Sequence, residues 1–233
     1  MLEKILNTEH KENARKTLVI SPHADDEVLG CGAYIDKETS TGNIVDVLIM
    51  AVGPYIAYSG KETPSEEKLE EVKLCHHKLG VRKSMVFCPA ESRLDTIPQN
   101  EIVSMLDQIL KEGYDTVFIP YPSRHADHQV TFNCAMASLR LNEGKQPESE
   151  VYLYEYPFVH NFDNIQGGAV YLPMTINDLN RKIANFQIYK SQVKKSPSPL
   201  NATGISTLAQ MRGMEAGLRF AEKYYLQTKT LWK

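Results

Sequence analysis

Short apolar runs alternate along the chain with longer stretches whose apolar residues recur at helical spacing. The short runs are rich in Val, Ile, Leu and Phe, which predicts strands that are covered on both faces. These predicted strands are 17–20, 43–52, 84–88, 115–120, 151–156 and 168–173. The longer stretches predict helices at 27–40, 63–79, 100–113 and 128–141, and near 176–191 and 206–226.

The predicted helix at 63–79 has the clearest boundaries. Thr63 is expected to be its N-cap, Pro64 its first residue and Glu66 the partner that completes a capping box. Gly80 suits the position that follows the last turn. This stretch is therefore predicted to be a regular helix between two strands.

The order of the elements indicates the fold class. Parallel strands need crossover connections, and the amphipathic helices between these strands would supply them. We therefore expect an α/β fold with a mainly parallel sheet and helices on both faces. No shift in composition marks a domain boundary, so residues 1–233 are expected to form a single domain, with 194–204 as a surface loop.

Composition and charge exclude several classes of protein. Hydrophobic residues make up 42% of the 233 residues and charged residues 24%, which is typical of a folded globular protein. The net charge of −3 provides no electrostatic basis for binding nucleic acid. No apolar run reaches the roughly 18 residues of a membrane span, and charges interrupt the region where a signal peptide would be apolar. We therefore expect a cytoplasmic protein without a nucleic-acid or membrane partner.

Two polar segments follow predicted strands and contain the candidate chemistry. They are SPHADDEVLGCG, residues 21–32, and YPSRHADHQ, residues 121–129. Because open α/β sheets bind ligands at the carboxyl ends of their strands, we expect these segments to lie close together. Each segment has two possible metal ligands three residues apart, a spacing that faces one side of a helix start. The two pairs are His23 with Asp26, and His125 with His128.

Two histidines and one carboxylate suit a catalytic zinc ion, which keeps one coordination position for water. A further carboxylate beside that water completes the groups needed for metal-assisted hydrolysis. A cation would also offset the repulsion among the adjacent Asp25, Asp26 and Glu27. The alternative is that each segment only caps the helix that follows it.

PHADDE (22–27), followed much later by HADH (125–128), resembles the paired motifs of the LmbE-like, or PIG-L, zinc-dependent N-deacetylases. The usual forms of these motifs are PHPDDE and HPDH, so Ala24 and Ala126 replace prolines that are not metal ligands. The order of elements and the closing segment RGMEAGLRFAEKYY (212–225) are also similar to that family. The resemblance implies a Rossmann-like three-layer α/β/α sandwich, in agreement with the element order.

The resemblance also implies roles for individual residues. It implies one Zn²⁺ per chain, bound by His23, Asp26 and His128, with another divalent metal such as Fe²⁺ as an alternative. Asp25 would be the general base that accepts a proton from the attacking water. His125, when protonated, would stabilise the tetrahedral intermediate or donate a proton to the leaving amine.

The resemblance has one further implication for the metal site and several for the substrate. Asp127 would orient one of the metal-binding histidines. Substrates of such enzymes are mostly N-acetylglucosamine (GlcNAc) units, free or attached to another group, so the implied reaction removes an acetyl group from an N-acetylated amino sugar or a GlcNAc conjugate. Many relatives bind substrate through an arginine near the start of the second helix, and residues 62–71 contain none. Relatives are often oligomers, which makes a homo-oligomer an expectation here.

Four residues are candidates for contacts with the sugar. Arg93 and Asp95 follow the third predicted strand, and Tyr55 and Tyr58 lie in the loop after the second. A few placed polar groups and aromatic side chains are typical of small-molecule sites. For the two tyrosines, an ordinary surface loop without a function is the alternative.

Two other patterns are interpreted as packing. Residues 30–32 (GCG) lack the third glycine of a dinucleotide-binding motif and are expected to let a helix pack closely on the sheet. Residues 75–77 (CHH) lie on one helix, where neighbours point about 100° apart and do not converge on a metal. His76 falls on the apolar face of that helix and is expected to be packed.

Three other functions fit part of the pattern. An amidase that acts on a thiol-sugar conjugate would share the same motifs. A non-haem Fe(II) oxygenase would use His23, Asp25 and a distant histidine as its facial triad, although such sites typically lie in all-β jelly rolls. A non-catalytic sugar-binding homologue would be expected to lack a ligand or the base. Metal-dependent hydrolysis of an amide is therefore the favoured hypothesis.

Overall fold

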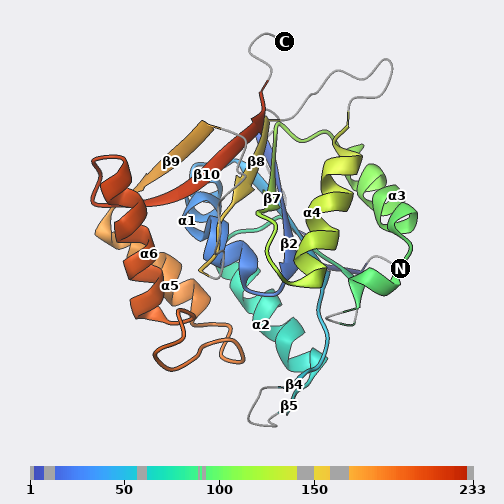
Figure 1. Cartoon of the computed structure of the whole chain (residues 1–233), viewed down its shortest axis with the longest axis horizontal. Coiled ribbons are helices and arrows are strands. Elements are labelled where there is room, and N and C mark those ends of the chain that lie inside the picture. The colour runs from blue at the N-terminus through green and yellow to red at the C-terminus, as the bar shows by residue number, and fades with distance from the viewer. Residues whose placement is uncertain are drawn as a thin grey trace.

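The computed structural model describes residues 3–7, 14–56, 62–88, 90, 93–140, 150–157 and 168–229. Within these residues, eight strands form one sheet (Figure 1). In chain order they are β1 (Glu3–Asn7), β2 (Lys16–His23), β3 (Ile44–Ala51), β6 (Lys83–Cys88), β7 (Thr116–Pro120), β8 (Glu150–Tyr154), β9 (Gly168–Met174) and β10 (Phe220–Thr228). The short strands β4 (Tyr55–Ile56) and β5 (Glu62–Thr63) form a separate antiparallel pair.

The middle of the sheet is parallel. The strand order is β1-β6-β3-β2-β7-β8-β10-β9, and the strands from β6 to β8 all run in one direction. β1 pairs antiparallel with β6 at one edge, and β10 pairs antiparallel with both β8 and β9 near the other. Every residue of β3 is buried, as expected where helices cover both faces. The predicted α/β fold with a mainly parallel sheet is confirmed.

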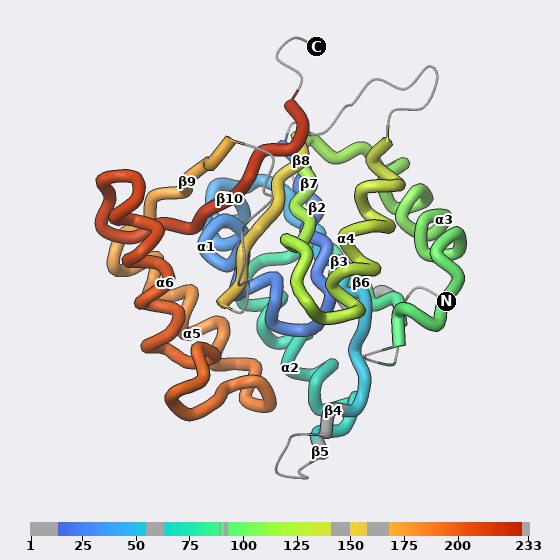
Figure 2. The backbone as a smooth tube through the Cα atoms, in the orientation of Figure 1, coloured from blue at the N-terminus to red at the C-terminus, as the bar shows by residue number. Residues whose placement is uncertain are grey.

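Helices cover the two faces of this sheet (Figures 1 and 2). They are α1 (Asp26–Ser40), α2 (Ser65–Lys78), α3 (Gln99–Leu110), α4 (Ala126–Ser138), α5 (Ile176–Phe186) and α6 (Ala202–Glu215). α3 packs on α4, which contacts β7, whereas α1 contacts β3 and α5 from the other side. The three-layer arrangement is therefore confirmed. None of the helices in the described residues has the length and apolar composition needed to cross a bilayer.

The direction in which the chain crosses the sheet reverses between β2 and β7. From β2 the chain moves outward through β3 to β6, and it then returns to place β7 and β8 on the opposite side of β2. Open α/β sheets bind their ligands at the carboxyl ends of the strands that flank such a reversal. β2 ends at His23 and β7 ends at Pro120, so both predicted motifs start at this point.

Gly30 allows α1 to lie close to the sheet. A Cβ atom added to Gly30 would lie 2.1 Å from Cδ2 of Tyr154 on β8. Tyr154 is completely buried, and its hydroxyl donates to the carbonyl of Ile20 in β2 at 3.0 Å. Because a packed interior has no room for that clash, the interpretation of residues 30–32 as a packing feature is confirmed at Gly30.

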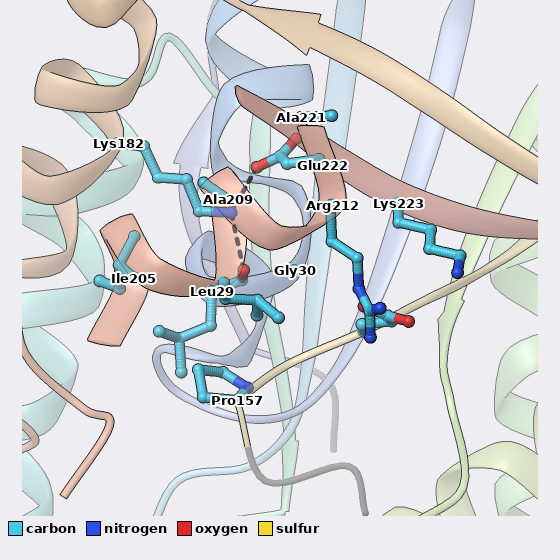
Figure 3. Close-up of a pocket in the computed structure, with 12 residues that line it drawn as sticks. Leu29, Gly30, Pro157, Lys182, Ile205, Ala209, Arg212, Ala221, Glu222 and Lys223 are labelled. Carbon is cyan, nitrogen blue, oxygen red and sulfur yellow. Dashed lines mark hydrogen bonds and ion pairs between the residues drawn. The ribbon is translucent and has the colours of Figure 1, made fainter. Parts of the chain in front are cut away.

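A buried ion pair fixes α1 against α5 and β10 (Figure 3). Lys182 of α5 donates to Oε1 of Glu222 in β10 at 2.6 Å and to the carbonyl of Leu29 in α1 at 2.8 Å. Glu222 also accepts the backbone N–H groups of Ala33 and Tyr34 in α1, at 2.9 and 3.0 Å. These bonds satisfy the buried charges and hold the helix whose first turn enters the candidate site.

The end of the chain differs from the prediction. The sequence pattern predicts a helix near 206–226, but α6 ends at Glu215 and β10 runs from Phe220 to Thr228. Gly217, with a φ of 69°, follows α6 and suits the left-handed conformation that ends many helices. Pairing with strands on both sides then determines the conformation of β10.

The start of α2 also differs from the prediction. Thr63 belongs to β5, where it pairs with Tyr55 of β4. Pro64 occupies the N-cap position and no side chain caps the helix, which begins at Ser65. The predicted capping box is therefore wrong, because Thr63 is part of a strand. Gly80, with a φ of 69°, follows the helix as predicted.

Candidate metal centre

The structure brings the two motifs together at the carboxyl ends of β2 and β7. His23 is the last residue of β2 and Asp26 the first residue of α1, while His125 is the N-cap of α4 and His128 lies in its first turn. The ring centroids of His23 and His128 are 5.1 Å apart, and those of His23 and His125 are 4.8 Å apart. Residues far apart in sequence therefore form one cluster.

Three potential ligand atoms in this cluster face one another. Nε2 of His128 lies 3.2 Å from Nδ1 of His23 and 3.3 Å from Oδ2 of Asp26, and the last two atoms are 3.7 Å apart. Ligand atoms of a tetrahedral zinc ion are about 3.3 Å apart, given bond lengths of about 2.0–2.1 Å. The chemistry and the spacing of these donors therefore fit a divalent metal ion.

Asp127 holds the other ring nitrogen of His23. Nε2 of His23 lies 2.8 Å from Oδ2 of Asp127, which is completely buried and whose Oδ1 accepts the N–H of Leu94 at 3.0 Å. Because an ionised carboxylate only accepts hydrogen bonds, Nε2 carries the ring proton and Nδ1 presents a lone pair toward the cluster. A carboxylate in this position orients the histidines of many metal sites.

Tyr156 holds His128 in a similar way. Nδ1 of His128 lies 2.6 Å from the hydroxyl of Tyr156, which donates in turn to the carbonyl of Tyr121 at 3.4 Å. When the hydroxyl accepts the Nδ1–H of His128, as a metal ligand requires, Nε2 presents a lone pair toward the cluster. The sequence pattern did not single out Tyr156. Its only signal was its place at the end of the predicted strand 151–156, on the same edge of the sheet as both motifs.

The electrostatics of the cluster favour a cation. Burial alone would raise the pKa of the Asp26 carboxyl, but the neighbouring His128 and His23 lower this pKa below its ordinary value. The carboxylate of Asp26 and two ring nitrogens then face one point. Ring nitrogens of His23, His125 and His128 also lie within 4.8 Å of one another, so the three histidines could hold a metal ion as well.

Asp25, the residue before Asp26, has a strained backbone conformation. The residue is only 6% exposed, and its φ of 109° is the single positive φ among the non-glycine residues that the structure describes. Such a conformation costs about 1–3 kcal/mol and is found preferentially at functional sites. Asp25 occupies the N-cap position of α1, yet its side chain makes no capping hydrogen bond. Helix capping therefore does not explain why an aspartate occupies this position.

His125 combines helix capping with exposure to solvent. Its Nδ1 accepts the N–H of Asp127 at 3.2 Å, as the capping interpretation expects. Partial burial, together with the neighbouring His23 and His128, lowers the pKa of the His125 ring. Because Nδ1 is an acceptor, the neutral ring carries its proton on Nε2. The geometry therefore favours a neutral donor at His125 over the protonated ring that the family resemblance implies.

The structure gives less information on the four candidate contacts with a sugar. Arg93 and Asp95 are exposed and flank Leu94, whose backbone N–H is bonded to the site. The side chain of Tyr55 and all of Tyr58 lie outside the described residues. Contacts of these four residues with a sugar stay predictions.

A curated relative shares part of this sequence. The chain is 32% identical over 126 residues to the diacetylchitobiose deacetylase of Thermococcus kodakarensis. The match covers 50% of this chain and 46% of the relative, so the chain spans about half the length of the curated relative it matches.

Solved structures share the fold over nearly the whole chain. An N,N'-diacetylchitobiose deacetylase from Pyrococcus horikoshii, in complex with its inhibitor, has a TM-score of 0.71 and 24% identity, over 93% of this chain and 85% of that chain. A 4-carboxy-2-hydroxymuconate hydratase from Pseudomonas putida KT2440 has a TM-score of 0.71 and 16% identity, over 94% of this chain and 98% of that chain. At these identities the likeness shows a shared fold.

A model of one protein family matches the segment that contains both motifs. The family is described as PIG-L: GlcNAc-PI de-N-acetylase, and the match extends over residues 18–139, just over half of the 233 residues. It includes the cluster from His23 to His128. The chain therefore belongs to the PIG-L (GlcNAc-PI de-N-acetylase) family.

Proposed function

We propose that this protein is a zinc-dependent deacetylase that hydrolyses the acetamide of an N-acetylated amino sugar or of a GlcNAc-containing conjugate. The proposal rests on the convergence of His23 Nδ1, Asp26 Oδ2 and His128 Nε2. Membership of the family supports an enzyme of the deacetylase type. The relative that is named for deacetylation of diacetylchitobiose supports an acetamido sugar as substrate.

His23, Asp26 and His128 would hold the metal, each through the atom that faces the other two. The chemistry that zinc supplies when bound is polarisation of the amide carbonyl and activation of water at neutral pH. Asp127 and Tyr156 keep the two histidines in the tautomers that binding requires. The metal site is thus proposed to be prearranged by the protein.

Asp25 is the proposed general base. Its ionised carboxylate would accept the proton of the attacking water, and a base in such a position contributes about 10²–10⁴-fold to the rate. Because the backbone of Asp25 is already fixed in an unusual conformation, little reorganisation is needed before the proton moves.

His125 is the proposed donor to the developing oxyanion. Its Nδ1 is occupied by the N–H of Asp127, which leaves Nε2–H as the group that donates. The side chain is exposed, so a substrate that arrives from solvent can reach it. A donor placed where negative charge develops stabilises the transition state. Asp25, which then holds the proton taken from water, protonates the amine as the C–N bond breaks, and acetate leaves.

The rival functions differ in how well the site and fold accommodate them. A facial-triad oxygenase typically occupies a jelly roll, whereas this sheet is mainly parallel and covered by helices. The shared fold of a hydratase shows that the fold is compatible with other reactions. An amidase acting on a thiol-sugar conjugate would use the same groups, and only its substrate separates it from the proposed deacetylase.

Acetate release is the direct test. Metal-free protein is loaded with Zn²⁺ and incubated with N-acetylglucosamine, N,N'-diacetylchitobiose, GlcNAc-phosphatidylinositol and a thiol-linked GlcNAc conjugate. We expect at least one substrate to yield acetate and free amine in equal amounts. Asp25→Asn should lower kcat by about 10²–10⁴-fold and still bind zinc. Zinc-loaded protein that releases acetate from none of them would contradict the sugar deacetylase.

A further inference from the structure

A buried polar cluster contacts the backbone of Asp25, and the proposed reaction does not use this cluster. Glu27, His76, Ser84 and Tyr189 are all 0% exposed. They belong to α1, α2, β6 and the segment after α5. A buried carboxylate and histidine are often less stabilising than apolar residues of the same volume. The cluster therefore needs an explanation beyond core packing.

Glu27 connects this cluster to Asp25. Oε2 of Glu27 accepts the backbone N–H of Asp25 at 3.1 Å. The hydroxyl of Ser21 also lies 3.3 Å from Oε2, but its single proton has a nearer acceptor, the carbonyl of His23 at 2.7 Å. The bond from Asp25 is therefore the better-formed of the two contacts that Oε2 makes.

The second oxygen of Glu27 is held from two other elements. The hydroxyl of Tyr189 donates to Oε1, and Nε2 of His76 lies 3.4 Å from the same oxygen. Nε2 of His76 makes no hydrogen bond with any described residue, whereas Nδ1 lies 2.6 Å from the hydroxyl of Ser84. Tyr189 thus holds one oxygen of the carboxylate by a hydrogen bond and His76 packs against that oxygen at 3.4 Å, while the other oxygen holds Asp25.

We propose that His76 and Tyr189 are positioning residues that act on Asp25 through Glu27. A φ of 109° persists at a non-glycine residue only where its surroundings enforce it, and Glu27 supplies an acceptor for the N–H of that residue. Loss of either partner lets the Glu27 carboxylate turn, which weakens its bond to Asp25 and relaxes the backbone there. The consequence for catalysis rests on the proposed function, in which Asp25 is the base.

Amide hydrogen exchange tests the positioning directly. In metal-free protein, His76→Leu should speed exchange at the Asp25 amide by about tenfold or more. Tyr189→Phe should act in the same direction, and it remains informative if His76→Leu does not fold, because it removes only a hydroxyl. His77→Leu, at the exposed neighbour on the same helix, is the matched control and should leave exchange unchanged. Unchanged exchange at Asp25 in Tyr189→Phe and in any folded His76→Leu would overturn the proposal.

Kinetics separate positioning from a purely structural role. In the zinc-loaded enzyme, His76→Leu should lower kcat by about 10- to 100-fold, with KM and zinc content unchanged. His76→Gln places an amide donor close to the position of Nε2 and should recover most of this loss. Equal losses in the two variants, or a loss of zinc, would overturn the proposal. If wild-type protein releases no acetate, the proposed function fails, and the exchange measurement still decides whether His76 positions Asp25.

Discussion

The two central histidines of the cluster each use one ring nitrogen for a protein partner and direct the other toward a common point. The partners differ in charge: His23 is held by the carboxylate of Asp127 and His128 by the neutral hydroxyl of Tyr156. A neutral partner adds no second negative charge to a region that already contains Asp26. Each histidine thus has a partner that fixes its tautomer, and only one of the two partners, Asp127, is a carboxylate.

Removing His128 should abolish metal binding, whereas removing His125 should not. Nε2 of His128 lies within 3.3 Å of the ligand atoms of both His23 and Asp26, and His125 uses its Nδ1 to cap α4. We therefore expect about one zinc per chain in wild type and in His125→Ala, and almost none in His128→Ala. Metal analysis after zinc loading and extensive dialysis would measure this.

The same measurement distinguishes the two possible donor sets. If His125→Ala loses zinc while Asp26→Asn retains it, the three histidines are the ligands and Asp26 is not. Circular dichroism of each variant serves as the control for folding, because His125 also accepts a backbone hydrogen bond at the start of α4. Either result identifies the metal ligands by the zinc content of the variants and does not depend on the resemblance to the family.

Residues within the two short motifs could be proposed from sequence, including Asp127 as the partner of a histidine, whereas partners outside the motifs could not. His23 and Asp26 are three positions apart at a strand end, so local geometry already places them together. Tyr156 contacts His128 across 28 positions, and Leu94 contacts Asp127 across 33. Such contacts depend on how strands and loops assemble, which no local pattern specifies.

At the scale of elements, the packing of α1 on the sheet depends on one position without a side chain. Gly30→Ala should lower the free energy of unfolding by about 1–3 kcal/mol, because the added Cβ would lie 2.1 Å from Cδ2 of Tyr154. Gly32→Ala is the matched control on the same helix. Its Cβ would meet side-chain carbons of Val28 and Lys182 at 3.1 and 3.3 Å, which are tight contacts without the overlap found at Gly30.

Chemical denaturation of the two variants would measure the difference. The gain in helix propensity from glycine to alanine is about 1 kcal/mol and is the same at both positions, so it cancels in the comparison. Equal midpoints for Gly30→Ala and Gly32→Ala would show that the overlap with Tyr154 costs no more than the contacts at Gly32. A lower midpoint for Gly30→Ala alone would show that the contact between α1 and β8 is rigid.

Most elements could be predicted from periodicity, and the failures have particular causes. The apolar runs of β2, β3, β6 and β7 are buried on both faces and give a clear pattern. In contrast, 220–228 has a local pattern that also fits a helix, and its pairing with β8 and β9 makes it a strand. The short pair of β4 and β5 gave no periodic signal at all, because strands of two residues have no period to detect.

At the scale of the whole molecule, the order of the parallel strands follows from general rules, whereas the strands added at the two edges of the sheet do not. The reversal between β2 and β7 is the usual topology of doubly wound sheets, so the site could be expected there. β1 and the antiparallel strands β9 and β10 extend the sheet beyond this core. Their addition depends on pairing between distant segments.

Zinc should stabilise the whole fold, because its proposed ligands lie on both sides of the reversal. His23 and Asp26 come from β2 and α1, and His128 comes from α4, 105 positions after His23. A ligand that binds only the folded state adds about 2.7 kcal/mol at a free concentration of a hundred times its Kd, which raises Tm by about 5–10 °C in a chain of this size. Thermal unfolding of metal-free and zinc-loaded protein would measure the shift.

His128→Ala is the decisive control for this stabilisation. We expect the variant to keep the eight-stranded sheet, which His128 does not belong to, but to lack one ligand, so added zinc should leave its Tm unchanged. A zinc-dependent shift of equal size in wild type and variant would mean that the ion binds elsewhere. A shift in wild type alone would show that zinc binds through His128. The ion would then connect α4 to β2 and α1, so that metal binding stabilises the whole fold.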